Sequence, residues 1–153
     1  MNTNGAELHL LINHFPVVGY PIVFIALAWG LFNRQNQIFL FGVYLSVLIW
    51  VSSFISYLTG EGAEDVLREL PDFNIDLIHQ HEDTAFIALI VGGVAALLGL
   101  CLTPWFQNKV SFFKKASFER WGRLAVLGLI LIVCVLFAVA ARQGGVIRHS
   151  EIR

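Results

Sequence analysis

The sequence is poor in charged residues, which make up only 14% of its 153 positions. An ordinary soluble domain carries about a quarter of its residues as charged side chains. With 57% hydrophobic residues, the composition excludes an ordinary soluble domain. The formal net charge of −1 gives no sign of a nucleic-acid partner, because it leaves no excess of cations for phosphates.

Several motifs of common cofactor and enzyme classes are also missing. The cysteines Cys101 and Cys134 both lie inside apolar runs, which indicates small buried hydrophobes and neither a disulfide framework nor a metal knuckle. Without a C-x-x-C-H motif, any haem would be bound non-covalently. Neither H-E-x-x-H nor a repeated Glu-x-x-His occurs. No Ser-His-Asp grouping or phosphate loop can be placed, so an electron carrier or a subunit is favoured over a stand-alone enzyme.

No lysine or arginine precedes the first apolar run, and no small-residue cleavage site follows it. A cleavable signal peptide needs both features. We therefore expect the first helix to stay in the mature protein.

Four long apolar runs dominate the sequence, at about residues 8–32, 38–58, 76–103 and 122–142. Each is long enough to cross a hydrocarbon core of about 30 Å. Between the third and fourth runs, aromatic residues alternate with lysines, as in a helix that lies in the headgroup region. The sequence predicts an all-α integral membrane four-helix bundle with a short interfacial helix, as one transmembrane domain over residues 1–153.

Lysine and arginine are biased toward the connections that follow the first and third runs. Because these residues favour the cytoplasm in short loops, we expect a multi-pass protein of the bacterial inner (cytoplasmic) membrane with both termini periplasmic. The connection side holds Arg34, Lys109, Lys114, Lys115, Arg120 and Arg123, and the terminal side holds Arg68, Arg142, Arg148 and Arg153.

All histidines fall at the terminal end of the predicted bundle, together with nearly all the acids. Ionisable residues in a spanning helix are costly, so they indicate a functional site. His9 and His14 are separated by about 140° around a helix, so they cannot share one ligand site unless the helix is distorted. The histidines are His9, His14, His79, His81 and His149.

The leading hypothesis is haem b held between two histidines. His14 on the first helix and His81 on the third would be axial ligands, with His9 and His79 as a second, shallower pair. Arg142 or Arg148 would meet the haem propionates. Ala88, Gly92 and Ala96 form a small-residue face behind His81 that leaves room for a porphyrin. This predicts a b-type cytochrome-like electron-transfer protein or subunit in the lipid bilayer, with other subunits of a redox complex or a periplasmic electron carrier as partners.

Two alternatives remain open. A non-haem site of histidine and carboxylate ligands would suit zinc or iron, with ligands drawn from His14, His81, His9, His79, His149 and Glu82. Alternatively, the chain is an accessory structural subunit of a membrane complex, with histidines that only form interfacial hydrogen bonds.

Short motifs spread over nearly the whole chain carry a resemblance. They are His9, His14-Phe15-Pro16, Thr59-Gly60-Glu61, His81-Glu82, and Gly144-Gly145 with His149. With these the chain resembles a family of short four-helix bacterial membrane proteins of unknown function. Family members often have proline after the first histidine, where this chain has Leu10. The resemblance implies the four-helix fold and no established activity, and it suggests an architecture similar to that of membrane b-type cytochromes.

Overall fold

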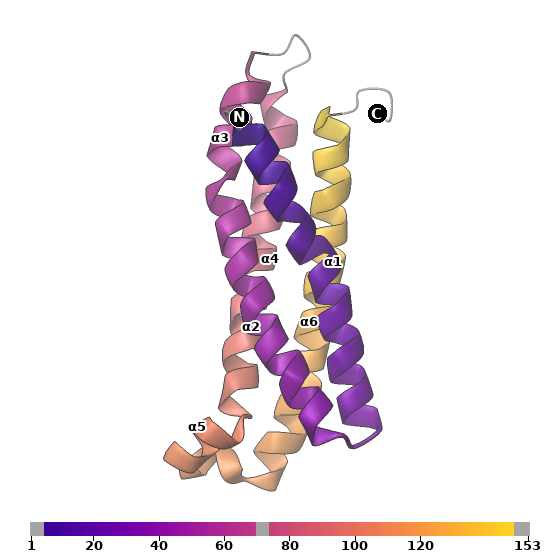
Figure 1. The fold of residues 1–153 in the computed structure, drawn as a ribbon, viewed down its shortest axis with the longest axis vertical. Coiled ribbons are helices and arrows are strands. Elements are labelled where there is room, and N and C mark those ends of the chain that lie inside the picture. Colours follow the sequence, from indigo (N-terminus) through magenta and orange to yellow (C-terminus); the bar gives the residue numbers. More distant parts are fainter. Residues whose placement is uncertain (1–4, 70–73, 149–153) are drawn as a thin grey trace.

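Four long helices run side by side along the molecule (Figure 1). The structure is a computed structural model that describes residues 5–69 and 74–148. Within these ranges there is no β-strand. The elements are α1 (Gly5–Phe32), α2 (Asn36–Leu58), α3 (Gly60–Leu67), α4 (Ile75–Cys101), α5 (Pro104–Lys109), the 3₁₀ turn η1 (Ser111–Lys114) and α6 (Ala116–Arg148).

Four helical segments of the described chain are long and apolar enough to cross a membrane: α1, α2 together with α3, α4, and α6. This confirms the predicted all-α four-helix bundle. The short helix α5 lies at the end of the bundle opposite the termini, between α4 and α6 (Figure 1).

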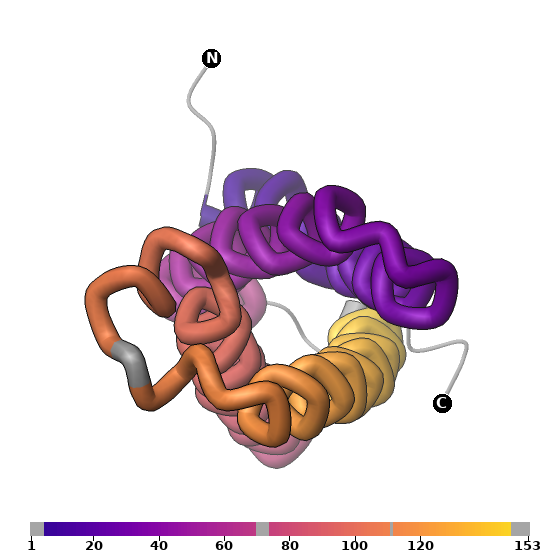
Figure 2. The backbone as a smooth tube through the Cα atoms, turned by 90° about the horizontal axis from the view of Figure 1, so that it is seen from below, coloured from indigo at the N-terminus to yellow at the C-terminus, as the bar shows by residue number. Residues whose placement is uncertain are grey.

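Each long helix packs mainly against two others. Helix α1 packs against α2 and α6, and α4 packs against the same two helices. Helices α1 and α4 therefore occupy opposite corners of the bundle, as the view along it shows (Figure 2). Side chains from α1 and α4 can meet only if they reach across the centre.

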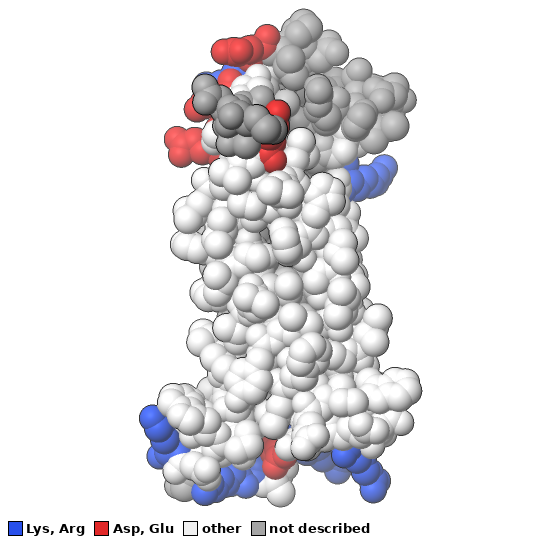
Figure 3. All heavy atoms as spheres, in the orientation of Figure 1, with Lys and Arg blue, Asp and Glu red and all other residues white. Residues whose placement is uncertain are grey.

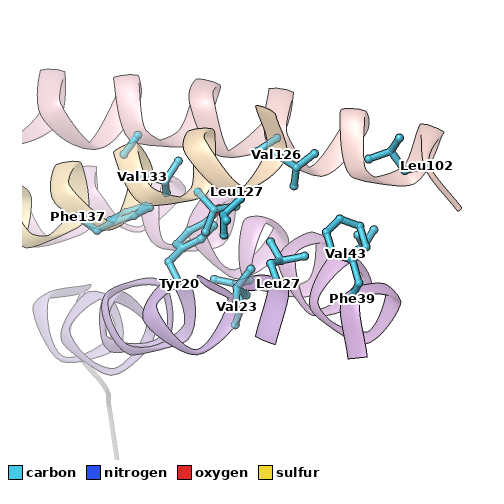
Figure 4. Packing of buried hydrophobic residues seen from close by; sticks show 14 residues of the cluster. Tyr20, Val23, Leu27, Phe39, Val43, Leu102, Val126, Leu127, Val133 and Phe137 are labelled. Atoms are coloured by element: carbon cyan, nitrogen blue, oxygen red, sulfur yellow. The ribbon is translucent and has the colours of Figure 1, made fainter. Parts of the chain in front are cut away.

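The core of the bundle is an apolar cluster to which α1, α2, α4 and α6 contribute (Figure 4). Tyr20, Val23 and Leu27 of α1 are fully buried in it, together with Phe39 and Val43 of α2. Large apolar side chains also cover the outside along its length, which indicates contact with a lipid bilayer. Examples are Leu11, Val18, Ile25, Leu48, Ile90, Leu97, Ile132 and Val135, all exposed.

Glycine permits two close contacts between helix backbones. A Cβ on Gly30 would lie 2.4 Å from the backbone nitrogen of Phe39, so α1 and α2 touch where the turn joins them. A Cβ on Gly5 would lie 2.3 Å from the carbonyl oxygen of Gly62, so the start of α1 lies against α3. The second contact fixes the position of the first turns of α1.

The helices extend beyond the predicted ranges at most of their ends. Helix α6 begins at Ala116 and continues to Arg148, whereas the apolar run predicted residues 122–142. Helix α1 begins at Gly5 and continues through both of its prolines, Pro16 and Pro21. Helix α4 ends at Cys101, two residues before the predicted boundary.

Candidate functional site: a histidine pair between opposite helices

His9 and His81 lie together near the end of the bundle that carries the described ends of the chain. His9 comes from α1 and His81 from α4, so the two rings meet across the bundle from opposite corners. Their ring centres are 6.4 Å apart and their planes are nearly perpendicular, at 83°. Both side chains are half-buried.

The hydrogen bonds of His9 determine which of its ring nitrogens carries the proton. Its Nδ1 lies 3.1 Å from the carbonyl oxygen of Ser56 and 3.1 Å from Oγ1 of Thr59, at the junction of α2 and α3. The Thr59 hydroxyl donates its own proton to Ser56 O at 2.8 Å, so both oxygens can accept from His9. Nδ1 of His9 is therefore the donor, and Nε2 of the neutral ring keeps its lone pair.

His81 has the same arrangement on the other side of the pair. Its Nδ1 lies 2.9 Å from the carbonyl oxygen of Ala140 in α6. A carbonyl can only accept, so Nδ1 of His81 donates, and in the neutral form of this ring Nε2 carries the lone pair. Histidines that bind metals usually donate their other ring N–H to a carbonyl or a carboxylate, which fixes the tautomer and the ring orientation. Both members of the pair meet this requirement.

Glycines lie beside both rings. A Cβ on Gly144 of α6 would lie 3.5 Å from Cε1 of His81, and a Cβ on Gly60 would lie 4.0 Å from Cε1 of His9. A larger side chain at Gly144 or Gly60 would have to extend past an imidazole. The backbones at Gly60 and Gly144 therefore pack closely against the two rings.

The other residues predicted for the site differ in their exposure. His14 is exposed, and its Nδ1 bonds to the carbonyl oxygen of Leu10 in its own helix. The side chains of His79 and Arg142 are exposed, and that of Glu82 is half-buried. The structure thus brings His9, not His14, to His81. His149 lies outside the described residues, as does the side chain of Arg148.

No larger cluster of metal ligands surrounds the pair in the described parts of the chain. Within them, no group of three or more His, Cys, Asp or Glu side chains could hold a metal ion. A closed zinc site needs four protein ligands, and a catalytic zinc site usually has three. The predicted site of histidine and carboxylate ligands is therefore not assembled among these residues.

The small-residue face of α4 is occupied by side chains from neighbouring helices. Ala88, Gly92 and Ala96 are buried. A Cβ on Gly92 would lie 2.5 Å from the hydroxyl oxygen of Tyr20, which reaches across from α1. At Gly92, this face therefore serves helix packing.

Sequence reasoning did not predict three of the groups that bond to the histidine pair: the Thr59 hydroxyl and the carbonyls of Ser56 and Ala140. Backbone carbonyls leave no trace in a sequence.

Charge is divided between the two ends of the bundle (Figure 3). Described acids gather at the end that carries the histidine pair, and described lysines and arginines gather mainly at the other end (Figure 3). At the histidine end, Glu64 of α3 pairs with Arg68 at 2.6 Å on the surface.

The fold and its apolar exterior define this chain as an all-α, multi-pass membrane protein. Comparison with protein-family models, with curated proteins and with solved structures found no match for the chain. Its function must therefore be argued from the geometry of the site.

Proposed function

We propose that this protein binds haem b between His9 and His81 and serves as a membrane-embedded, b-type cytochrome-like electron-transfer protein or subunit. One observation carries the proposal. Two imidazoles meet from opposite helices, and the Nδ1 of each lies within hydrogen-bond distance of a carbonyl oxygen, so each ring in its neutral form has its lone pair on Nε2. Neutral imidazole with a free lone pair is a common axial ligand of haem iron.

The spacing of the rings fits two imidazoles on one metal. A metal–nitrogen bond is about 2 Å long, so two imidazoles whose ring centres lie about 6 Å apart could both reach one metal ion. The observed separation is 6.4 Å.

The number of ligands favours haem over an isolated metal ion. A porphyrin supplies four of the six ligands of its iron, so two histidines complete the set. Zinc bound by His9 and His81 alone would be short of protein ligands, and no third His, Cys, Asp or Glu joins them among the described residues. Two histidines without a third ligand are therefore better matched to haem.

Bound haem would supply a one-electron redox centre. His9 and His81 would hold the iron, while the carbonyls of Ser56 and Ala140 would orient the rings and raise their basicity as ligands.

The distribution of charge supports an orientation for the proposed electron carrier. Lysine and arginine at the end of the bundle away from the histidines favour a cytoplasmic location for that end. The termini and the histidine pair would then face the periplasm of a bacterial inner membrane. Other subunits of a redox complex or a periplasmic electron carrier would exchange electrons there.

The proposal predicts which histidines are needed for a haem spectrum. Protein purified after haem-replete expression should show a Soret band, and an α band on reduction. His9→Ala and His81→Ala should each abolish both bands, because each removes one of the two histidines that would hold the iron. His14→Ala is the matched control: it removes the same side chain from the same helix at an exposed position, so it should keep the spectrum.

The helical circular dichroism and the elution volume of each variant show whether it has folded. Absence of a Soret band from folded wild-type protein would end the haem proposal. Loss of the bands in His14→Ala but not in His9→Ala would reject this choice of ligands.

The same hydrogen bonds favour a second candidate, an accessory structural subunit. His9 links α1 to the α2–α3 junction, and His81 links α4 to α6, so the pair joins all the long helices. Under this alternative, wild-type protein would contain no chromophore, and His9→Ala would lower only the melting temperature. Elemental analysis that finds stoichiometric zinc or iron without porphyrin would instead support the non-haem site.

A further inference from the structure

At the opposite end of the bundle, we propose that a pocket between the end of α1 and the start of α6 binds an anionic phospholipid. The pocket has a volume of about 470 Å³. Leu31 and Phe32 line it from α1, and Arg120, Arg123 and Leu124 line it from α6. It is independent of the histidine pair and of the proposed electron transfer.

The charges in the pocket leave one arginine available for a ligand. Arg123 is committed to the protein, since it donates to Glu119 and to Asn36 at 2.6 Å each and lies 4.6 Å from the ring centre of Phe39. Glu119 is thereby neutralised. Arg120 is exposed and has no ion pair or hydrogen bond with any described residue. The pocket therefore presents an unpaired guanidinium, which suits a phosphate group.

The apolar part of the pocket argues for a lipid and against a free anion. Leu31, Phe32 and Leu124 offer surface to an acyl chain, and inorganic phosphate would make no use of it. The pocket also lies between the end of α1 and the start of α6, two helices that are long and apolar enough to cross a membrane. Basic pockets between spanning helices are known to hold anionic headgroups.

The surrounding charge adds to this complementarity. The described lysines and arginines of the same end raise the local concentration of anionic lipid (Figure 3). Arg120 distinguishes a specific site from a diffuse cationic surface, because it lines the pocket next to the apolar residues. The test must therefore compare Arg120 with a cation of the same end outside the pocket.

Lys114 is that matched control, because it is exposed, belongs to the same end and does not line the pocket. The full chain, delipidated in a neutral detergent, is titrated with phosphatidylglycerol, phosphatidylcholine or inorganic phosphate, and bound species are counted by native mass spectrometry. Phosphatidylglycerol should bind well above the other two. Arg120→Gln should weaken its binding about fivefold, the effect of one cation at an anionic surface, and Lys114→Gln should leave it unchanged.

A second variant should strengthen the binding of phosphatidylglycerol, so the test does not depend on loss of binding alone. Glu119→Gln removes the acid that neutralises Arg123, so phosphatidylglycerol should bind more tightly. Equal binding of the two lipids would overturn the site, as would equal weakening by Arg120→Gln and Lys114→Gln. If inorganic phosphate competes with an affinity equal to that of phosphatidylglycerol, the pocket is a simple anion site, and the proposed lipid site is overturned.

Discussion

Among single residues, the glycines of this bundle differ sharply in what surrounds them. A Cβ on Gly30 would lie 2.4 Å from the backbone nitrogen of Phe39, whereas a Cβ on Gly128 would meet nothing within 4 Å. Backbone cannot move aside as a flexible side chain can. Gly30→Ala should therefore force α1 and α2 apart and lower stability by about 1–3 kcal/mol, the usual cost of overpacking.

Gly128→Ala is the matched control for Gly30→Ala. It makes the same change in α6 where there is space, and alanine favours a helix over glycine by up to about 1 kcal/mol. Thermal unfolding in detergent should show a lower midpoint for Gly30→Ala, and an unchanged or higher one for Gly128→Ala. Equal midpoints for the two variants would mean that α1 and α2 do not touch at this point.

The positions of His9 and His14 show what sequence reasoning cannot predict for single residues. Their spacing predicts that they point in different directions, which the structure agrees with. It could not predict which of them faces the bundle. In a membrane helix, residues that face lipid and residues that face other helices are both apolar, so hydropathy gives no inward side. Leu11 and Val23 illustrate this, since the first is exposed and the second buried.

At the scale of elements, the turn between α1 and α2 depends on one unusual backbone conformation. Arg34 has a φ of 56°, in the left-handed region. The amide of Gln35 donates to the carbonyl of Gly30 at 2.9 Å, and that of Arg34 donates to the carbonyl of Leu31 at 3.4 Å. These are the two bonds of a Schellman motif, in which the left-handed position is usually glycine.

Replacement of Arg34 by glycine should therefore stabilise the protein. A left-handed residue with a Cβ costs about 1–2 kcal/mol, and Arg34→Gly removes much of this cost. Arg34→Ala removes the same charge but keeps a Cβ, so it should give no gain. The comparison requires only the unfolding midpoints of the two variants. A midpoint for Arg34→Ala equal to that of Arg34→Gly would attribute any effect to charge and not to the backbone.

The ends of the helices were less predictable than their number. Four apolar runs suffice to predict four spanning helices, because the bilayer thickness sets their length. Helix ends outside the apolar region depend on local hydrogen bonds, which hydropathy does not detect. At the start of α4, the Asn74 side chain accepts from the amides of Asp76 and Leu77, and so the helix begins at Ile75. Helix α6 similarly begins at Ala116, well before its apolar run.

For the whole molecule, the arrangement of the helices decides which residues can form a site. The order of packing places α1 and α4 at opposite corners, so only inward-facing residues of these helices meet. Sequence reasoning assigned histidines of these two helices to one end of the bundle, and the structure places His9 and His81 there. Sequence reasoning could not predict which histidine of α1 pairs with His81, because this depends on how each helix is rotated about its axis.

The whole molecule also carries the charge asymmetry from which its proposed orientation follows. Three exposed lysines near α5 supply much of the cationic charge at the end opposite the histidines: Lys109, Lys114 and Lys115. Because cations resist transfer across the membrane, they should hold this end in the cytoplasm and the termini outside. A reporter enzyme fused after Arg153 and active only outside the cytoplasm should then be active.

Replacing all three lysines by glutamine should remove much of this bias and give a mixture of orientations, seen as lower reporter activity at equal protein level. The matched replacement by arginine keeps the charge and should keep full activity. An inactive reporter on the wild-type chain would place the termini, and with them the His9–His81 pair, on the cytoplasmic side. The redox partner of the proposed haem would then have to be sought there, while the ligand geometry itself would stand unchanged.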